Sequence, residues 1–258
     1  KGGICNRNMK RKLLQKAQDK TFIRFLDKDK KQQGIYILQR NDKHTIEQLK
    51  EYAIKNELDI LYYPNTIALS KEHWNMYYKG MNINISKHQV YEMDTLFIDI
   101  DKPLYENYYQ LQSAIKDSGI NNYQVFESAS GNIHLYIKVV KFSDVEQYKV
   151  LVKTIGNYLE QKGIVIDASS SNPIQKTYLE DFRILSKQGF SSKYIKELSH
   201  RGKQQTPFQV LKEMHQRGIK IEREYSIKYA MYLLQDELQY NYSGELHLSQ
   251  LEEKYLVP

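Results

Sequence analysis

Between residues 94 and 186, strand-like and helix-like segments follow one another in an order that few folds share. Residues 95–101 alternate with period two, so Ile98 and Ile100 face one side of a strand and the residues between them face the other. The further elements are a helix over 104–118, strands over 123–128 and 133–140 joined by a turn at 129–132, a helix from 143 to about 161 and a strand over 164–167. This β-α-β-β-α-β order is typical of the split βαβ motif of ferredoxin-like and RNA-recognition-type (RRM-like) folds. We therefore expect an α+β fold with a split βαββαβ core.

The segments on either side of this core have different patterns. An N-terminal α/β extension is expected from strands near 34–39 and 60–63 with a helix over 45–56 between them. After a strand over 182–186 the pattern becomes helical, with Thr206 and Pro207 opening a helix that Gly218 ends and a longer helix over 222–240. We expect a catalytic domain over 1–187, with its motif core at 94–187, and a helical accessory domain over 188–258.

The composition is that of a globular protein, because 41% of the residues are hydrophobic and 27% are charged. No apolar run approaches the roughly 18 to 20 residues of a membrane span, so we expect no membrane association. A single cysteine, Cys5, provides neither a disulfide framework nor a cysteine-ligated zinc site. The expected location is the reducing cytoplasm.

Positive charge is concentrated at the N-terminus. Residues 1–31 hold eleven Lys and Arg against three Asp, a net charge of +8, so the other 227 residues sum to −1. Such a basic segment on a nearly neutral body can follow the phosphate backbone of a nucleic acid. The alternative is a solvated, lysine-rich helix face.

Two aspartates at the end of the first core strand carry the main chemical signal. Asp99 and Asp101 are two residues apart, so both carboxylates leave the same face of the strand. Two carboxylates this close repel each other unless a cation neutralises them, and paired oxygen donors suit Mg²⁺ or Mn²⁺. The alternative is a pair of exposed acids on an edge strand.

The expected topology brings a histidine to the same place. In the split βαβ motif the first and third strands are antiparallel neighbours, so the end of the first strand lies beside the start of the third, where His134 stands. The turn that precedes this strand contains Ser130 and Gly131, which could offer a hydroxyl and backbone N–H groups to a phosphate. The alternatives are a structural histidine and an ordinary hairpin turn.

Three more candidate residues lie later in the chain. Asp167 ends the buried run 164–166 and is a candidate third carboxylate, and Arg183 is a candidate phosphate ligand because a guanidinium matches phosphate oxygens. If the last strand ran parallel to the third, its beginning rather than its end would lie near Asp99. Asp181 is therefore the alternative third acid.

These motifs resemble, in order and type, motifs one to three of archaeo-eukaryotic primases and primase-polymerases. The resemblance extends over residues 94 to about 188, although the second motif is one residue shorter than the family's usual spacing and lacks its second glycine. It implies that Asp99, Asp101 and Asp167 hold two divalent metals, Mg²⁺ or Mn²⁺, as the catalytic group. It also implies that Ser130, His134 and Arg183 bind the triphosphate of the incoming nucleotide.

The function implied by this resemblance is that of a DNA primase-polymerase, a DNA-directed nucleotidyltransferase that copies single-stranded DNA in plasmid or phage replication initiation. Its partners would be a single-stranded DNA template, dNTP or NTP, and a replicative helicase fused or in trans. Three alternatives stay open: a rolling-circle Rep or relaxase-like nuclease, a metal-dependent sugar-nucleotide transferase, and a non-catalytic single-stranded DNA-binding module. The nuclease chemistry needs a His-hydrophobic-His pair, and none of the seven histidines is two residues from another.

Overall fold

The computed structural model describes residues 20–29, 32–39, 43–67, 69–81, 83–85, 90–128, 130–179 and 192–221. The strands are β1 (Lys20–Leu26), β2 (Gln32–Gln39), β3 (Asp59–Tyr62), β4 (Thr66–Ile67), β5 (Val90–Pro103), β6 (Asn122–Glu127), β7 (Asn132–Phe142), β8 (Thr177–Tyr178), β9 (Lys193–Tyr194) and β10 (His200–Arg201). The helices are α2 (Lys43–Lys55), α3 (Lys71–Tyr78), α4 (Leu104–Ser118), α5 (Val145–Gln161) and α6 (Pro207–Gln216), with 3₁₀ turns η2 (Ala168–Ser171) and η3 (Lys196–Leu198). The mixed α+β class predicted from the sequence is confirmed.

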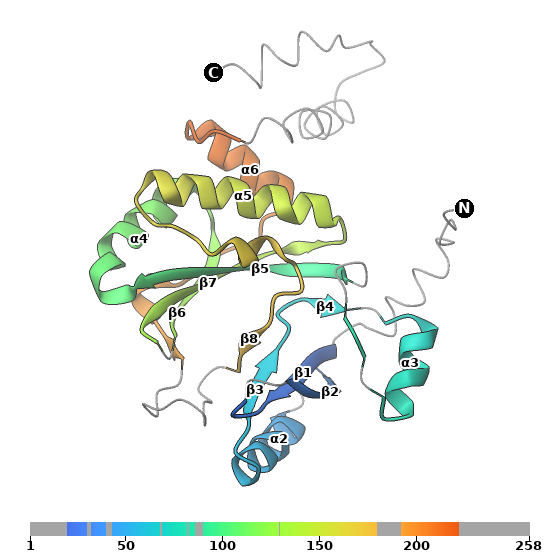
Figure 1. Ribbon diagram of the computed structural model, residues 1–258. Helices are drawn as coiled ribbons and strands as arrows, with labels where there is room; N and C mark the ends of the chain where they lie inside the picture. Colours follow the sequence, from blue (N-terminus) through green and yellow to red (C-terminus); the bar gives the residue numbers. More distant parts are fainter. Residues whose placement is uncertain are drawn as a thin grey trace, which may run out of the picture.

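A larger sheet forms the body of the molecule, in the order β10-β6-β7-β5-β4, with β9 also pairing with β6. Helices α4 and α5 lie against this sheet (Figure 1), and α6 packs against both α5 and β7. The central strands β5 and β7 are antiparallel, as the sequence predicts for the first and third strands of the core.

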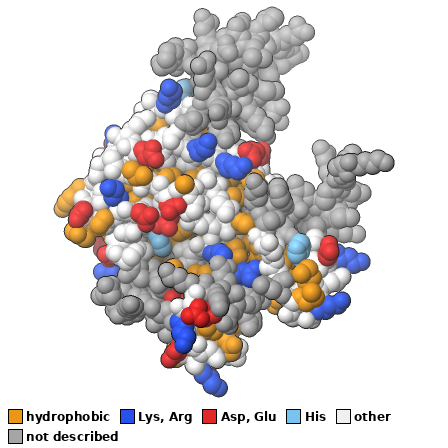
Figure 2. Space-filling model, in the orientation of Figure 1, with side chains coloured by type: hydrophobic (Ala, Val, Ile, Leu, Met, Phe, Trp, Pro, Cys, Tyr) orange, Lys and Arg blue, Asp and Glu red, His pale blue; other side chains and the backbone are white. Residues whose placement is uncertain are grey.

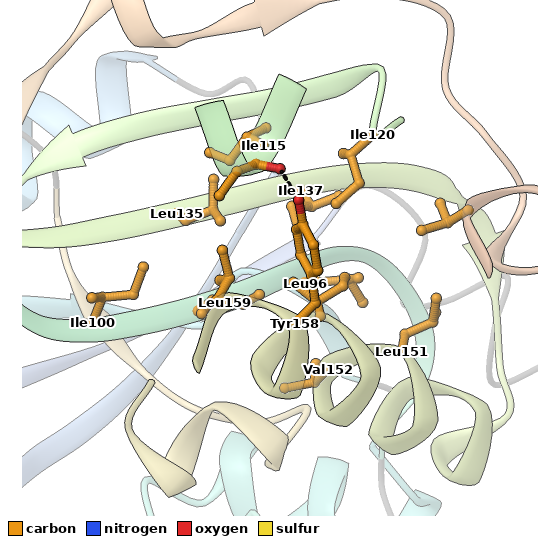
Figure 3. Packing of buried hydrophobic residues seen from close by; sticks show 14 of the residues in the cluster. Leu96, Ile100, Ile115, Ile120, Leu135, Ile137, Leu151, Val152, Tyr158 and Leu159 are labelled. Atoms are coloured by element: carbon orange, nitrogen blue, oxygen red, sulfur yellow. Dashed lines mark hydrogen bonds between the residues drawn. The ribbon is translucent and has the colours of Figure 1, made fainter. Parts of the chain in front are cut away.

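The hydrophobic core lies between this sheet and its helices. The inward residues of β5 and β7, among them Ile100 and Leu135, are fully buried there, and they meet Leu151 and Leu159 of α5 (Figure 3). Tyr158 of α5 also enters the core and donates its hydroxyl to the backbone carbonyl of Ala114, at 3.1 Å. Burying these apolar side chains is the main contribution that fixes the sheet against its helices.

The two long helices have the ends that their sequences favour. Helix α4 ends at Gly119, whose φ of +79° is a left-handed conformation that glycine adopts without strain. The cap of α5 is Asp144, which accepts hydrogen bonds from the backbone N–H groups of Glu146 and Gln147. The helix predicted from residue 143 therefore begins slightly later, after its cap at Asp144.

The last predicted strand of the core is not formed. Residues 164–167 make one backbone hydrogen bond to β5, from the Asp167 N–H to the Asp99 carbonyl at 2.8 Å, and no strand is present there. The physical reason is that the Asp167 side chain caps η2, so the chain turns immediately after its first contact with β5. Short strand β4 pairs with the other end of the same edge of β5.

A second, smaller sheet is formed by the N-terminal extension, in the order β2-β1-β3-β8. One cluster of buried side chains lies between this sheet and α2, and another lies beside α3 (Figure 1). Strand β8 brings the chain back from the η2 region to this sheet, so the segment after Asp167 links the two sheets.

The described residues beyond 191 join the larger sheet and its core. Strands β9 and β10 pair with β6, and α6 begins with the capping box of Thr206 and Gln209 that its sequence favours. The predicted boundary at 187, the predicted strand over 182–186 and the predicted helix over 222–240 lie outside the described residues, as do residues 1–19 of the basic segment. In the described part of the chain no helix has the length and apolarity to cross a bilayer.

Candidate metal and nucleotide site

Asp99 and His134 occupy directly opposed positions on the central strands β5 and β7. The His134 Nε2 atom lies 3.5 Å from Asp99 Oδ1, and both side chains are largely buried, at 13% and 27% exposed. The His134 ring also packs edge-on against Phe97, with 5.2 Å between the ring centres. The sequence predicted this proximity from topology alone, and the register of the sheet provides it.

Asp101 stands where the pairing of β5 with β7 becomes irregular. Ile100 pairs with Ile133, but the next pair is Pro103 with Asn132, so β5 has two extra residues at this point. Such bulges bend a strand and redirect its side chains. Here the exposed Asp101 carboxylate accepts a hydrogen bond from Asn132 Nδ2 at 3.2 Å, which ties it to the start of β7.

Asp167 reaches the same end of the sheet from the other edge of β5. Its backbone N–H bonds the Asp99 carbonyl, and the Asp99 N–H donates to the hydroxyl of fully buried Ser170 at 3.0 Å. The Asp167 carboxylate accepts the backbone N–H of Ser169 at 2.6 Å. Hydrogen bonds from Ser169 lower the pKa of Asp167, so this acid is held ionised beside Asp99.

The pKa of Asp99 is affected by the other two acids. Burial raises its pKa to about 6, and the negative charges of Asp101 and Asp167 add to the increase. One member of the group therefore resists ionisation because its neighbours are already charged. A cation placed among these carboxylates would remove that penalty.

Ser130 lies in the turn before β7, beside the junction of β5 with α4. Gly131 has a φ of +84° and donates its N–H to the Ser128 carbonyl, and its own carbonyl accepts the N–H of Leu104 at the start of α4. The exposed Ser130 hydroxyl lies 2.9 Å from the hydroxyl of Ser128. The turn is thus fixed to the helix that follows Asp101, and this places the predicted Ser130 at the same end of the sheet as the acids.

An aromatic cluster lies behind the acids on the same face of the sheet. Phe97, Phe126 and Tyr136 are buried there, with Tyr62 of β3 and Tyr194 of β9 packed against them. Tyr136 is only 3% exposed and donates to the Thr177 hydroxyl at 3.3 Å. A relaxase needs an accessible tyrosine nucleophile, so the buried Tyr136 does not support that alternative.

From the predicted set, Asp99, Asp101, Asp167 and His134 lie near one another, and Ser130 lies in the turn before β7. Arg183 and the alternative acid Asp181 lie outside the described residues. Sequence reasoning missed Ser170 and the contact of Asn132 with Asp101. A buried serine three residues after Asp167 had no distinctive pattern, whereas Asn132 stood inside the recognised turn and could have been considered.

The fit of these residues to a divalent cation can be judged from their donors. Asp99 and Asp101 offer ionisable oxygens whose mutual repulsion a hard cation relieves, and this matches the chemistry of Mg²⁺ or Mn²⁺. Within the described ranges, no three His, Cys, Asp or Glu side chains are already arranged as a complete metal site. The Asp167 carboxylate accepts the Ser169 N–H and so caps η2.

No protein-family model and no curated protein matches the sequence. Solved structures do match. The AEP domain of the primase-polymerase of cyanophage S-2L is similar over 79% of this chain and 93% of its own, with a TM-score of 0.51 and 14% identity. The chain has the fold of an archaeo-eukaryotic primase domain.

Two further structures with this primase fold are similar to the chain. Primase RepB' matches with a TM-score of 0.51 and 13% identity over 95% of this chain and 68% of that one. The catalytic domain of RepB', solved in complex with initiator DNA, matches with the same TM-score and identity over 90% and 97%. The predicted resemblance is thus confirmed at the level of the fold.

Proposed function

We propose that the protein is a primase-polymerase that adds nucleotides to a growing strand on a single-stranded DNA template. The observation that carries this proposal is the convergence of Asp99, Asp101 and Asp167 beside His134 at one end of the larger sheet. The primase fold supports the same reading.

Asp99, Asp101 and Asp167 are the proposed ligands of Mg²⁺ or Mn²⁺. When bound, these cations supply charge neutralisation, activate the attacking 3′-hydroxyl and stabilise the pyrophosphate leaving group. The protein prepares for this by holding Asp99 in the sheet through Ser170 and by orienting Asp101 through Asn132. Asp167 is brought to the same end of the sheet by its backbone hydrogen bond to the Asp99 carbonyl.

His134, Ser130 and Arg183 are the proposed contacts of the incoming triphosphate. His134 is fixed between Asp99 and the Phe97 ring, so its orientation is set before substrate arrives. The Ser130 hydroxyl is exposed at the tip of a turn whose backbone is fixed. Groups that need no reorganisation at the moment of reaction are the ones that stabilise developing charge best.

The basic segment 1–31 is proposed to contact template phosphates. The proposed role is in the initiation of plasmid or phage replication, together with a helicase that is fused to the chain or acts in trans. The test is incubation of the full chain with unprimed single-stranded DNA, labelled dNTP or NTP and Mn²⁺ or Mg²⁺. Wild type is expected to form products. The double variant Asp99→Asn with Asp101→Asn is expected to form about a hundredfold less product, or none.

The matched control is Asp117→Asn, which removes an aspartate from the exposed face of α4 and should leave synthesis unchanged. A primed template, tested in parallel, separates an enzyme that only extends primers from one that also initiates. Full synthesis by the double variant would overturn the metal assignment. Absence of synthesis on both templates, with DNA still bound, would favour the non-catalytic DNA-binding alternative.

A further inference from the structure

Helix α3 presents an aromatic group that the proposed catalytic site does not use. Trp74 is nearly buried in the core beneath α3, and the Tyr78 ring stacks on it at an angle of 26°, with 5.8 Å between the ring centres. Tyr77 packs edge-on against both rings. Tyr78 is nevertheless 77% exposed, so a rigidly backed aromatic ring faces solvent.

Basic side chains surround this group. Lys20 of β1 places its Nζ atom 4.8 Å from the centre of the Trp74 ring. Lys71 and Lys79 are exposed at the two ends of α3, and Lys71 shares a helix face with Trp74 and Tyr78 by its spacing. Figure 2 shows orange side chains beside blue ones over α3, at the right of the molecule. Glu72 is the acidic residue of the helix, so these three lysines leave the surface positive.

This surface lies near the start of the strand that carries the acids. Strand β4 pairs with the first residues of β5 just before the chain enters α3, so α3 lies beside the start of β5. Asp99 is nine residues further along β5, which at about 3.4 Å per residue is about 30 Å away. A stacked nucleic-acid strand advances about 3.4 Å per nucleotide, so a strand that follows β5 from its first residue to Asp99 would need about nine nucleotides.

We propose that the surface formed by Lys20, Lys71, Trp74, Tyr77, Tyr78 and Lys79 is a binding platform for single-stranded DNA. A base stacks on the exposed face of Tyr78, and the lysines contact the neighbouring phosphates. Aromatic rings inside a positive surface are the usual means of holding single strands without regard to sequence, because every base has a π-face. The identification of this strand as the template rests on the proposed function.

Anisotropy of a fluorescent oligo-dT of about 20 nucleotides, long enough to reach both places, tests the platform. Tyr78→Ala is expected to raise the Kd about tenfold, and Tyr78→Phe is expected to bind as wild type because it keeps the ring. Tyr109→Ala is the matched control, since Tyr109 is 81% exposed on α4 and lacks the flanking lysines of α3. An equal loss of oligo-dT affinity in Tyr78→Ala and Tyr109→Ala, or no loss of affinity in Tyr78→Ala, would overturn the proposal.

The lysines have a separate signature. Lys79→Ala is expected to reduce the slope of log K against log salt by about 0.7, the value for one phosphate contact on a single strand. An unchanged slope in both Lys79→Ala and Lys71→Ala would count against the phosphate contacts. All measurements are repeated with Asp99→Asn and Asp101→Asn in the same chain. A Tyr78 effect that persists there would show that binding at the platform does not need the two acids. A Tyr78 effect in a wild-type chain that forms no products on either template would retain the platform while the catalytic proposal fails.

Discussion

Asp99 and His134 face each other across the two central strands, with Asp99 Oδ1 3.5 Å from His134 Nε2, while Asp101 and Asp167 add negative charge to the same place. The pair therefore lies beside two further negative charges. Burial and like charges raise the pKa of Asp99 to about 6, so the ionised form of this residue costs free energy in the folded protein.

The first prediction concerns Asp99→Asn in the absence of metal. Because the folded pKa is above the unfolded value, the folded protein binds the proton more tightly, and the stability that this residue contributes is lost as pH rises from about 4 through about 6. At pH about 7.5 the variant should therefore be more stable than wild type, by roughly 2–4 °C in Tm for each kcal/mol relieved. Near pH about 4 the difference should vanish.

Differential scanning calorimetry across this pH range checks the prediction, with Asp117→Asn as a control that should follow wild type. Adding Mn²⁺ at pH about 7.5 should then raise the Tm of wild type and leave that of Asp99→Asn unchanged, because a ligand stabilises only the form that binds it. An Asp99→Asn variant that is less stable than wild type at high pH would contradict the electrostatic reading.

The meeting of Asp99 and His134 could be predicted because it depends on two rules. Alternation along a strand sets the face of each residue, and antiparallel pairing of the first and third strands sets the end of the sheet. The first rule is local, and the second follows from the order of the elements along the chain, which the sequence pattern gives. The same holds for the end of α4 at Gly119, which the sequence identifies by residue type.

The remaining features depend on contacts that no local pattern encodes. Residues 164–166 have a strand-like apolar run, but Asp167 uses its side chain to cap η2, and only its backbone meets β5. Tyr136 lies on the same face of β7 as His134, where Tyr62 of β3 and Tyr194 of β9 cover it. Both outcomes are set by segments distant in sequence, so neither the hydrophobic periodicity nor the secondary-structure propensity of these residues could predict them.

The second prediction concerns Ser170, whose buried hydroxyl accepts the Asp99 N–H. Ser170→Ala leaves that N–H without its partner at the edge of β5, so the free energy of unfolding should fall by about 1–3 kcal/mol. Urea denaturation measures this loss. Ser171→Ala is the matched control within η2, because its hydroxyl donates only to the adjacent turn, at the Ala168 carbonyl. Equal effects of the two substitutions would show that the Asp99 contact is not the cause.

The third prediction concerns Asn132, which orients Asp101 through a 3.2 Å hydrogen bond. Under the proposed function, Asn132→Ala should raise the Mn²⁺ concentration needed for half-maximal synthesis by about tenfold, the usual effect of removing a partner that orients a metal ligand. Metal titrations of strand synthesis measure this. The activity at saturating metal should largely recover, because Asp101 itself is intact. A loss that metal cannot restore would point to a different role for Asn132.

The fourth prediction concerns Gly156 of α5, whose missing side chain lets the segment before Asp167 approach the helix. A Cβ at this position would lie 2.5 Å from Ile166 Cδ1 and 3.1 Å from its Cγ1. Gly156→Ala gains up to about 1 kcal/mol of helix propensity, but overpacking typically costs about 1–3 kcal/mol. We therefore expect a net destabilisation of about 1 kcal/mol, measured by urea denaturation, and weaker synthesis because Ile166 adjoins Asp167.

Ile166→Val provides the internal control because it removes the Cδ1 methyl group that the new Cβ would meet. Alone it should cost about 0.5–1.5 kcal/mol, but in the Gly156→Ala background it should restore stability. The coupling energy from this double-mutant cycle should be favourable by about 1 kcal/mol or more, since the two residues share one contact. Additive effects would mean that the helix and the Asp167 segment do not press against each other here, and that α5 has no part in placing Asp167.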